Sequence, residues 1–145
     1  MADYDHYLRA VAIGMRHAND QSLAAHGITN QQARLLGEIY ERIESRGEIS
    51  RKALGEAMGI RGPSVTSLLN GLENSGFIVR RPGDKDGRTM QLEITAKAMR
   101  LIDETARVFA ESERRLLQGF TEEQEKSFLE LLQKAYRNIG IGSRA

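Results

Sequence analysis

The chain has 145 residues, of which 40% are hydrophobic and 28% charged, and its formal net charge is +1. This composition indicates one folded domain with a real core and excludes a disordered tail. There is no apolar run of membrane-spanning length, no signal-peptide core and no cysteine, so we expect a cytoplasmic protein without membrane contact, disulfides or a thiolate metal site.

Two helices are predicted in the first third of the chain. Apolar residues recur at helical spacing over roughly residues 4 to 25, and Gly27 ends that helix. The next helix opens on Thr29 and Gln32, which match a capping box, and runs to Gly47. Its apolar side belongs in the core.

A short helix, a glycine turn and a second helix are predicted next. Ser50 caps the first of these helices, Leu54, Ala57 and Met58 form its buried stripe, and Gly59 supplies the left-handed residue that ends it. The second helix begins at Gly62 and Pro63, because proline suits the first helical position. Its inward-facing residues recur at i, i+3, i+4 and i+7: Val65, Leu68, Leu69 and Leu72.

The outer face of this second helix is made of small polar residues. Pro63, Thr66, Ser67 and Asn70 fall opposite the apolar stripe, and Ser64 lies near the N-terminal edge of the same face. Small hydroxyls and amides suit a helix that reads a DNA groove, because they contact base edges and phosphates without bulk. An ordinary solvated helix face is the alternative.

A β-hairpin is predicted after the second helix. Residues 77–81 have strand composition, and apolar and polar residues alternate over residues 89–94. The loop between them, residues 83–88, is polar and Gly-rich, so we expect it to project into solvent. There Arg88 can enter a DNA minor groove, with Asp86 orienting its side chain. An ordinary turn of mixed charge is the alternative.

Two further helices complete the chain. Thr95 caps a long one that reaches Gly119, and a capping box at Thr121 and Gln124 opens the last. These two helices and the first carry apolar sides that find few partners within one chain. Dimerisation would bury them, and a two-fold dimer would also present two recognition helices to successive major grooves. Packing within a single chain is the alternative.

The charge distribution agrees with a nucleic-acid partner. Residues 50–100 contain nine basic and five acidic side chains, a balance of +4, whereas the remainder carries −3. The segment predicted to face DNA is therefore the basic part of the chain. The three histidines lack metal-ligand spacing, and no pair of residues suggests catalysis, so we expect no metal, no cofactor and no enzyme activity.

The second helix and the hairpin carry a family resemblance. The sequence resembles the DNA-binding core of the MarR family of bacterial transcriptional regulators at Arg61–Leu69, Leu72–Glu73, Gly76–Ile78, Arg80–Arg81, Asp86–Arg88 and Leu92–Thr95. The resemblance implies a mainly α (α+β) fold, a winged helix-turn-helix with about six helices and a small β-hairpin wing. It further implies a single domain over residues 1–145, with a DNA-binding lobe at 29–95 and a helical dimerisation region at 1–28 and 96–145.

The resemblance also implies a function. Members are homodimers that bind pseudo-palindromic operators, and many release DNA when a small, often aromatic or phenolic, effector binds. We therefore expect a homodimeric transcriptional regulator that acts as a repressor. By position, the resemblance implies that Pro63, Ser64 and Ser67 face the groove and that Arg88 is the wing arginine, with Asp86 as its partner. The predicted DNA-binding residues also include Arg61, Thr66 and Asn70 on the recognition helix. A winged-helix module that binds RNA or protein without regulating a promoter is the competing interpretation.

Overall fold

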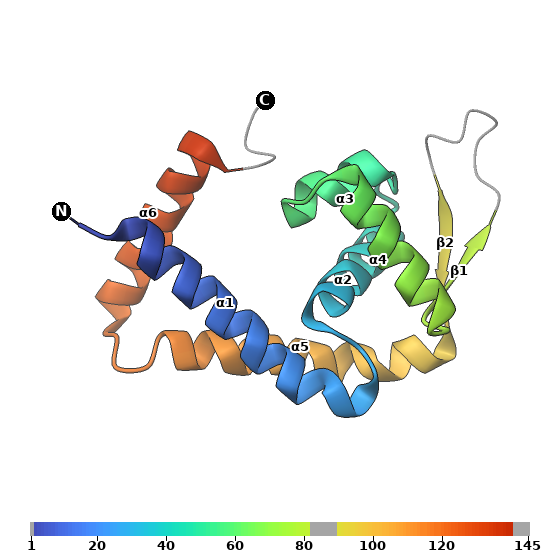
Figure 1. Ribbon diagram of the computed structural model, residues 1–145, viewed down its shortest axis with the longest axis horizontal. Helices are drawn as coiled ribbons and strands as arrows, with labels where there is room; N and C mark the ends of the chain where they lie inside the picture. Colours follow the sequence, from blue (N-terminus) through green and yellow to red (C-terminus); the bar gives the residue numbers. More distant parts are fainter. Residues whose placement is uncertain (1, 82–89, 141–145) are drawn as a thin grey trace.

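In the computed structural model, which describes residues 2–81 and 90–140, six α-helices, a short 3₁₀ turn and a two-stranded hairpin follow one another along the chain (Figure 1). The elements are α1 (Tyr4–Leu23), a 3₁₀ turn (Ala24–His26), α2 (Asn30–Ser45), α3 (Arg51–Met58), α4 (Gly62–Asn74), β1 (Ile78–Arg81), β2 (Gln91–Ile94), α5 (Ala96–Leu116) and α6 (Glu122–Ile139). This architecture confirms the predicted mainly helical fold with one small hairpin. None of the helices in the described ranges combines the length and apolar character needed to cross a bilayer.

The helices begin where the sequence places their caps. The side chains of Thr29 and Thr121 each accept from the backbone three residues on, and the capping boxes with Gln32 and Gln124 are complete. Ser50 and Thr95 cap α3 and α5 in the same way. Each cap satisfies amides that the first helical turn leaves without a partner, so these predictions are confirmed.

Two local predictions are wrong. Helix α2 ends at Ser45 instead of running to Gly47, and Arg46 takes the left-handed conformation with φ 56° while the Gly47 amide donates to the carbonyl of Arg42. Ala57 is exposed, and Gly55 is buried in its place on α3. Ala57 lines an open pocket between α2, α3 and α5, which is why a small apolar residue there is not covered.

The core lies under α2, α3, α4 and the hairpin. Its fully buried side chains are Leu35, Leu36, Ile39, Leu54, Val65, Leu69, Leu72, Phe77 and Ile78. Three of the four predicted inward residues of α4 are among them, and Leu68 is half-buried against the same core. Helix α4 is therefore held by one face only, and its other face is left for solvent or a partner.

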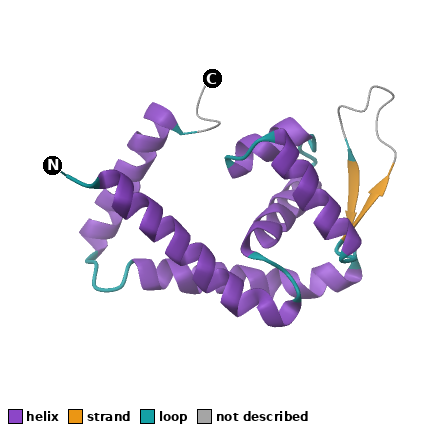
Figure 2. Ribbon diagram, viewed as in Figure 1, coloured by secondary structure: helices purple, strands orange, loops and turns teal. Residues whose placement is uncertain are grey.

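Helices α1, α5 and α6 form a second, more open group (Figures 1 and 2). α1 packs along α5, and α6 buries no residue at all in the described chain. A buried hydrogen bond of 2.8 Å, from the Asn19 side-chain amide to the Asn30 side-chain oxygen, joins α1 to the start of α2. This bond ties the helical group to the core of the other lobe.

Candidate nucleic-acid interface

The turn between α3 and α4 is tight because Gly55, which has no side chain, lies where the backbone of Ile60 passes closest to α3. The Ile60 amide donates to the Gly55 carbonyl at 3.0 Å, and Gly59 ends α3 with φ 68°. A β-carbon at Gly55 would lie 2.8 Å from the Ile60 carbonyl oxygen. A glycine inside an eight-residue helix is the sequence signal for such a close approach.

The outer face of α4 is exposed and polar, as its spacing predicts. Pro63, Ser64, Ser67 and Asn70 are exposed, and so is Arg61 at the N-cap. Thr66 differs, because it is half-buried and its hydroxyl donates to the Gly62 carbonyl at 3.2 Å. The structure therefore leaves five of the six predicted helix residues accessible on α4 and its N-cap.

The hairpin lies beside α4 (Figure 1). Strands β1 and β2 are antiparallel, with Arg80 opposite Leu92 and Arg81 opposite Gln91. The alternating burial of Met90, Leu92 and the residues between them confirms the predicted half-buried strand. Asp86 and Arg88, the two predicted wing residues, lie outside the described residues.

Two adjacent arginines of β1 have different partners. Arg81 pairs with Glu93 of β2 through two hydrogen bonds of 3.1 Å, and these bonds, followed by the opposite charge, raise the pKa of Arg81 and lower the pKa of Glu93. Both side chains are exposed, so solvent screens the pair. Arg80 instead reaches α4, where it donates to the side-chain oxygen of Asn70 and lies 3.4 Å from a Glu73 oxygen. The sequence analysis missed this contact.

The junction between α4 and α5 is held by polar contacts. The Thr95 hydroxyl donates to the Gly76 carbonyl at 2.7 Å, and the Lys97 ammonium donates to the Ser75 carbonyl at 2.7 Å. The same ammonium lies 4.8 Å from the ring centre of Phe77. The start of α5 is thus anchored to the end of the exposed helix.

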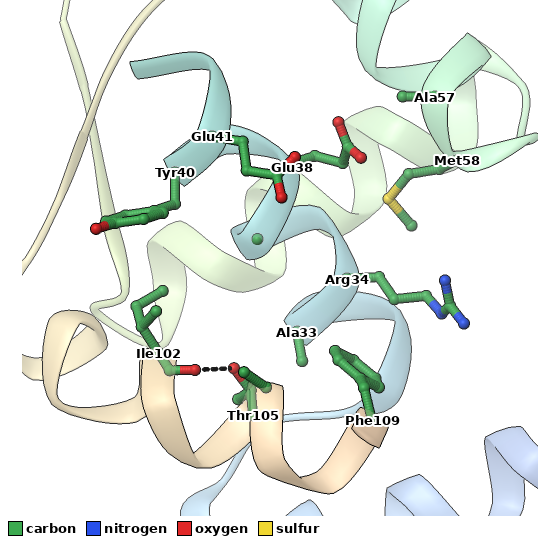
Figure 3. A pocket seen from close by; sticks show the side chains of 12 residues that line it. Ala33, Arg34, Glu38, Tyr40, Glu41, Ala57, Met58, Ile102, Thr105 and Phe109 are labelled. Atoms are coloured by element: carbon green, nitrogen blue, oxygen red, sulfur yellow. Dashed lines mark hydrogen bonds between the residues drawn. The ribbon is translucent and has the colours of Figure 1, made fainter. Parts of the chain in front are cut away.

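A pocket of about 480 Å³ opens between α2, α3 and α5 (Figure 3). Its apolar wall includes Ala33, Met58, Ile102 and Phe109, and the guanidinium of Arg34 lies 5.3 Å from the ring centre of Phe109. Tyr40, Glu38 and Glu41 supply the polar side. The volume falls within the range of small-molecule sites, roughly 300–1,000 Å³.

The histidines take no part in these sites. His6, His17 and His26 are exposed, as expected of surface residues. Within residues 2–81 and 90–140, no group of three or more His, Asp or Glu residues is arranged to hold a metal ion.

Comparison with known proteins agrees with this geometry. A family model described as "MarR family" matches residues 26–89. A putative MarR family transcriptional regulator from Clostridium acetobutylicum is 30% identical over 95% of this chain and 98% of its own, with a TM-score of 0.68. The MepR–DNA complex of S. aureus is 26% identical over 94% and 96%, with a TM-score of 0.81.

A third solved structure is similar in fold. It is a putative MarR family transcriptional regulator from Listeria monocytogenes complexed with 26mer DNA, 21% identical over 96% of this chain and 90% of its own, with a TM-score of 0.83. MepR is described as a transcription regulator of a multidrug efflux pump, and the other two relatives are named as putative MarR family transcriptional regulators. The helix-turn-helix, the hairpin wing and the relatives agree, and the chain belongs to the MarR family of winged-helix transcriptional regulators.

Proposed function

We propose that this protein acts as a homodimer that binds a pseudo-palindromic DNA operator and represses transcription from it. The observation that carries the proposal is the exposed face of α4, with Arg61, Ser64 and Ser67 accessible on a helix whose other face is fixed in the core. Such a face can enter a major groove without rearrangement. Two of the similar structures, from S. aureus and L. monocytogenes, hold DNA.

In this proposal the lobe at residues 29–95 binds DNA, and residues 1–28 and 96–145 form the dimer. Exposed apolar side chains on α1 and α6 support the second part, among them Tyr4, Tyr7, Leu8, Leu129 and Ile139. A second copy of the chain would cover them, and the two-fold axis would place two α4 helices one helical turn of DNA apart, about 34–36 Å.

We expect loss of base reading when the small hydroxyls of α4 are removed. Operators are first selected from random DNA with the wild-type protein. Ser64→Ala with Ser67→Ala should then weaken binding to the selected site by about 1–3 kcal/mol, because base contacts are lost, while binding to unrelated DNA hardly changes. Fluorescence anisotropy at fixed salt measures both affinities.

The exposed Ser127 on α6 provides the matched control for these substitutions. Ser127→Ala should leave both affinities unchanged, because α6 lies outside the lobe assigned to DNA. Unaltered site preference in the α4 double variant would reject α4 as the reading helix.

The wing contact is proposed for Arg88, with Asp86 as the residue that orients it, on the strength of the sequence alone. We expect Arg88→Ala to weaken operator binding strongly and to reduce the slope of log affinity against log salt by about one per protomer. Asp86→Ala should have a smaller effect, and none when Arg88 is already alanine. Full affinity of the Arg88→Ala protein near physiological salt would contradict the wing assignment.

The pocket of Figure 3 is the proposed site of a small aromatic or phenolic effector. It touches α3 on one side and α5 on the other, so a ligand there could alter the spacing of the two recognition helices. Gly37 lines this pocket, and no atom lies within 4 Å of the position that a β-carbon at Gly37 would take. Gly37→Leu should therefore fill part of it and reduce release of DNA by a phenolic acid such as salicylate, with DNA affinity kept. Equal release from wild-type and Gly37→Leu proteins would place the effector elsewhere.

A further inference from the structure

The side chain of Arg80 joins the hairpin to the exposed helix. Its terminal nitrogen donates to the Asn70 side-chain oxygen, and its Nε lies 3.4 Å from a Glu73 carboxylate oxygen, so one guanidinium contacts two residues one turn apart on α4. The Arg80 side chain is 29% exposed, against 55% for its neighbour Arg81. Arg80 is thus half-buried between the two elements that the proposed function assigns to DNA.

The contact fixes the orientation of the Asn70 amide. A guanidinium has only donors, so the atom of Asn70 that faces Arg80 must be the oxygen. An asparagine that reads adenine uses its oxygen and its nitrogen together. The oxygen of Asn70 is already held by a charged donor, which makes a stronger hydrogen bond than a neutral one.

We infer that Arg80 is a positioning residue that latches the hairpin to α4, and that Asn70 serves DNA recognition through Arg80 instead of by reading a base. This inference rests on the proposed DNA binding by α4 and the hairpin. It changes the role expected for Asn70, which the periodicity of α4 alone assigned to the groove.

A latch of this kind acts by holding two contacts in register. In the proposed DNA complex, α4 and the wing bind neighbouring grooves. Once α4 is bound, the wing contact is favoured only if the hairpin is already held near its groove. A hairpin that already sits at the right distance from α4 loses less conformational freedom on binding. The latch therefore adds affinity without itself touching DNA.

Lysine substitutions separate a latch from a phosphate contact. Lysine keeps the charge but lacks the planar guanidinium, which donates to Asn70 through one terminal nitrogen while its Nε lies 3.4 Å from a Glu73 carboxylate oxygen. Arg80→Lys should weaken operator binding about tenfold, and the matched control Arg81→Lys, next to it on β1, less than about twofold. Equal tolerance of lysine at both positions would overturn the latch, because it would show that only charge is needed.

Asn70 is tested by a double-mutant cycle on the selected operator. If Asn70 works through Arg80, Asn70→Ala combined with Arg80→Lys should weaken binding no more than the stronger single change. Sites selected with the Asn70→Ala protein should keep the base preference of the wild type. If the double variant instead loses affinity by the product of the two single losses, and the Asn70→Ala protein accepts other bases at one position, Asn70 is a base reader and the inference is refuted.

A measurement without DNA distinguishes failure of the latch from failure of the proposed function. Amide hydrogen exchange in β1 and β2 should become about tenfold faster in Arg80→Lys and in Asn70→Ala, and stay near the wild-type rate in Arg81→Lys, with exchange in α2 unchanged in all three. Unchanged hairpin exchange in both Arg80→Lys and Asn70→Ala overturns the latch whatever the DNA result. A wild-type protein that selects no DNA sequence, with faster hairpin exchange in these variants, removes the DNA role and keeps the latch.

Discussion

Leu129→Glu should convert the protein to a monomer and remove tight operator binding. Leu129 lies on α6, 57% exposed, on the apolar side of a helix that buries none of its residues within the chain. In a dimer this side chain would be covered, and burying a carboxylate there costs at least about 2 kcal/mol per copy. Two copies meet in a two-fold interface, so the dimer dissociation constant should rise about a thousandfold.

Sedimentation at micromolar concentration and anisotropy on the selected operator measure the two losses. Ser127→Glu adds the same charge two residues away, about 160° around the helix, and should leave the protein dimeric. Monomeric Leu129→Glu that still binds the full operator with wild-type affinity would separate dimerisation from DNA binding and contradict the proposal.

Gly55→Ala should destabilise the fold although alanine is the better helix former. The added β-carbon would lie 2.8 Å from the Ile60 carbonyl oxygen and 3.4 Å from a Val65 methyl. The neighbour at the shorter distance is backbone, which cannot rotate away. Overpacking of this kind costs about 1–3 kcal/mol, against a propensity gain of about 1 kcal/mol, so we expect a net loss of up to about 2 kcal/mol.

The same substitution at Gly37 has the opposite sign. Gly37 lies inside α2, and a β-carbon there meets no atom within 4 Å. Gly37→Ala should therefore stabilise the protein by about 0.5–1 kcal/mol. Urea unfolding of both variants at one protein concentration tests the pair. Stability of Gly55→Ala at or above that of the wild type would show that the turn between α3 and α4 yields at little cost.

Local sequence patterns predicted most of the fold because each helix start has a local cause. Thr29, Ser50, Thr95 and Thr121 cap helices through contacts three residues away, so short motifs suffice to locate them. The helix ends are harder. The sequence placed a stop at Gly47, yet Arg46 takes the left-handed conformation, and beyond this turn the Arg42 guanidinium donates to the Glu48 carbonyl.

The candidate site was predictable only as a surface. The 100° turn per residue separates the exposed Ser64 and Ser67 from the buried Val65 and Leu69, so the outer face of α4 follows from spacing. The contact between Asn70 and Arg80 spans two elements, and periodicity carries no information about it. The pocket beside Phe109 likewise requires three helices to meet, which only the tertiary structure shows.

Helix α5 spans the distance between the two groups of elements. Its 21 residues give a length of about 31 Å at 1.5 Å per residue. At one end Thr95 and Lys97 are bonded to the turn that follows α4, and at the other Leu116 and Leu117 line a groove with α6. If α5 moves as a rigid rod, a tilt of about 5° about one of its ends displaces its other end by roughly 3 Å. That displacement is close to the 3.4 Å rise per nucleotide along the axis of DNA, so in the proposed dimer a small rotation in the α6 region would shift α4 by about one base-pair step.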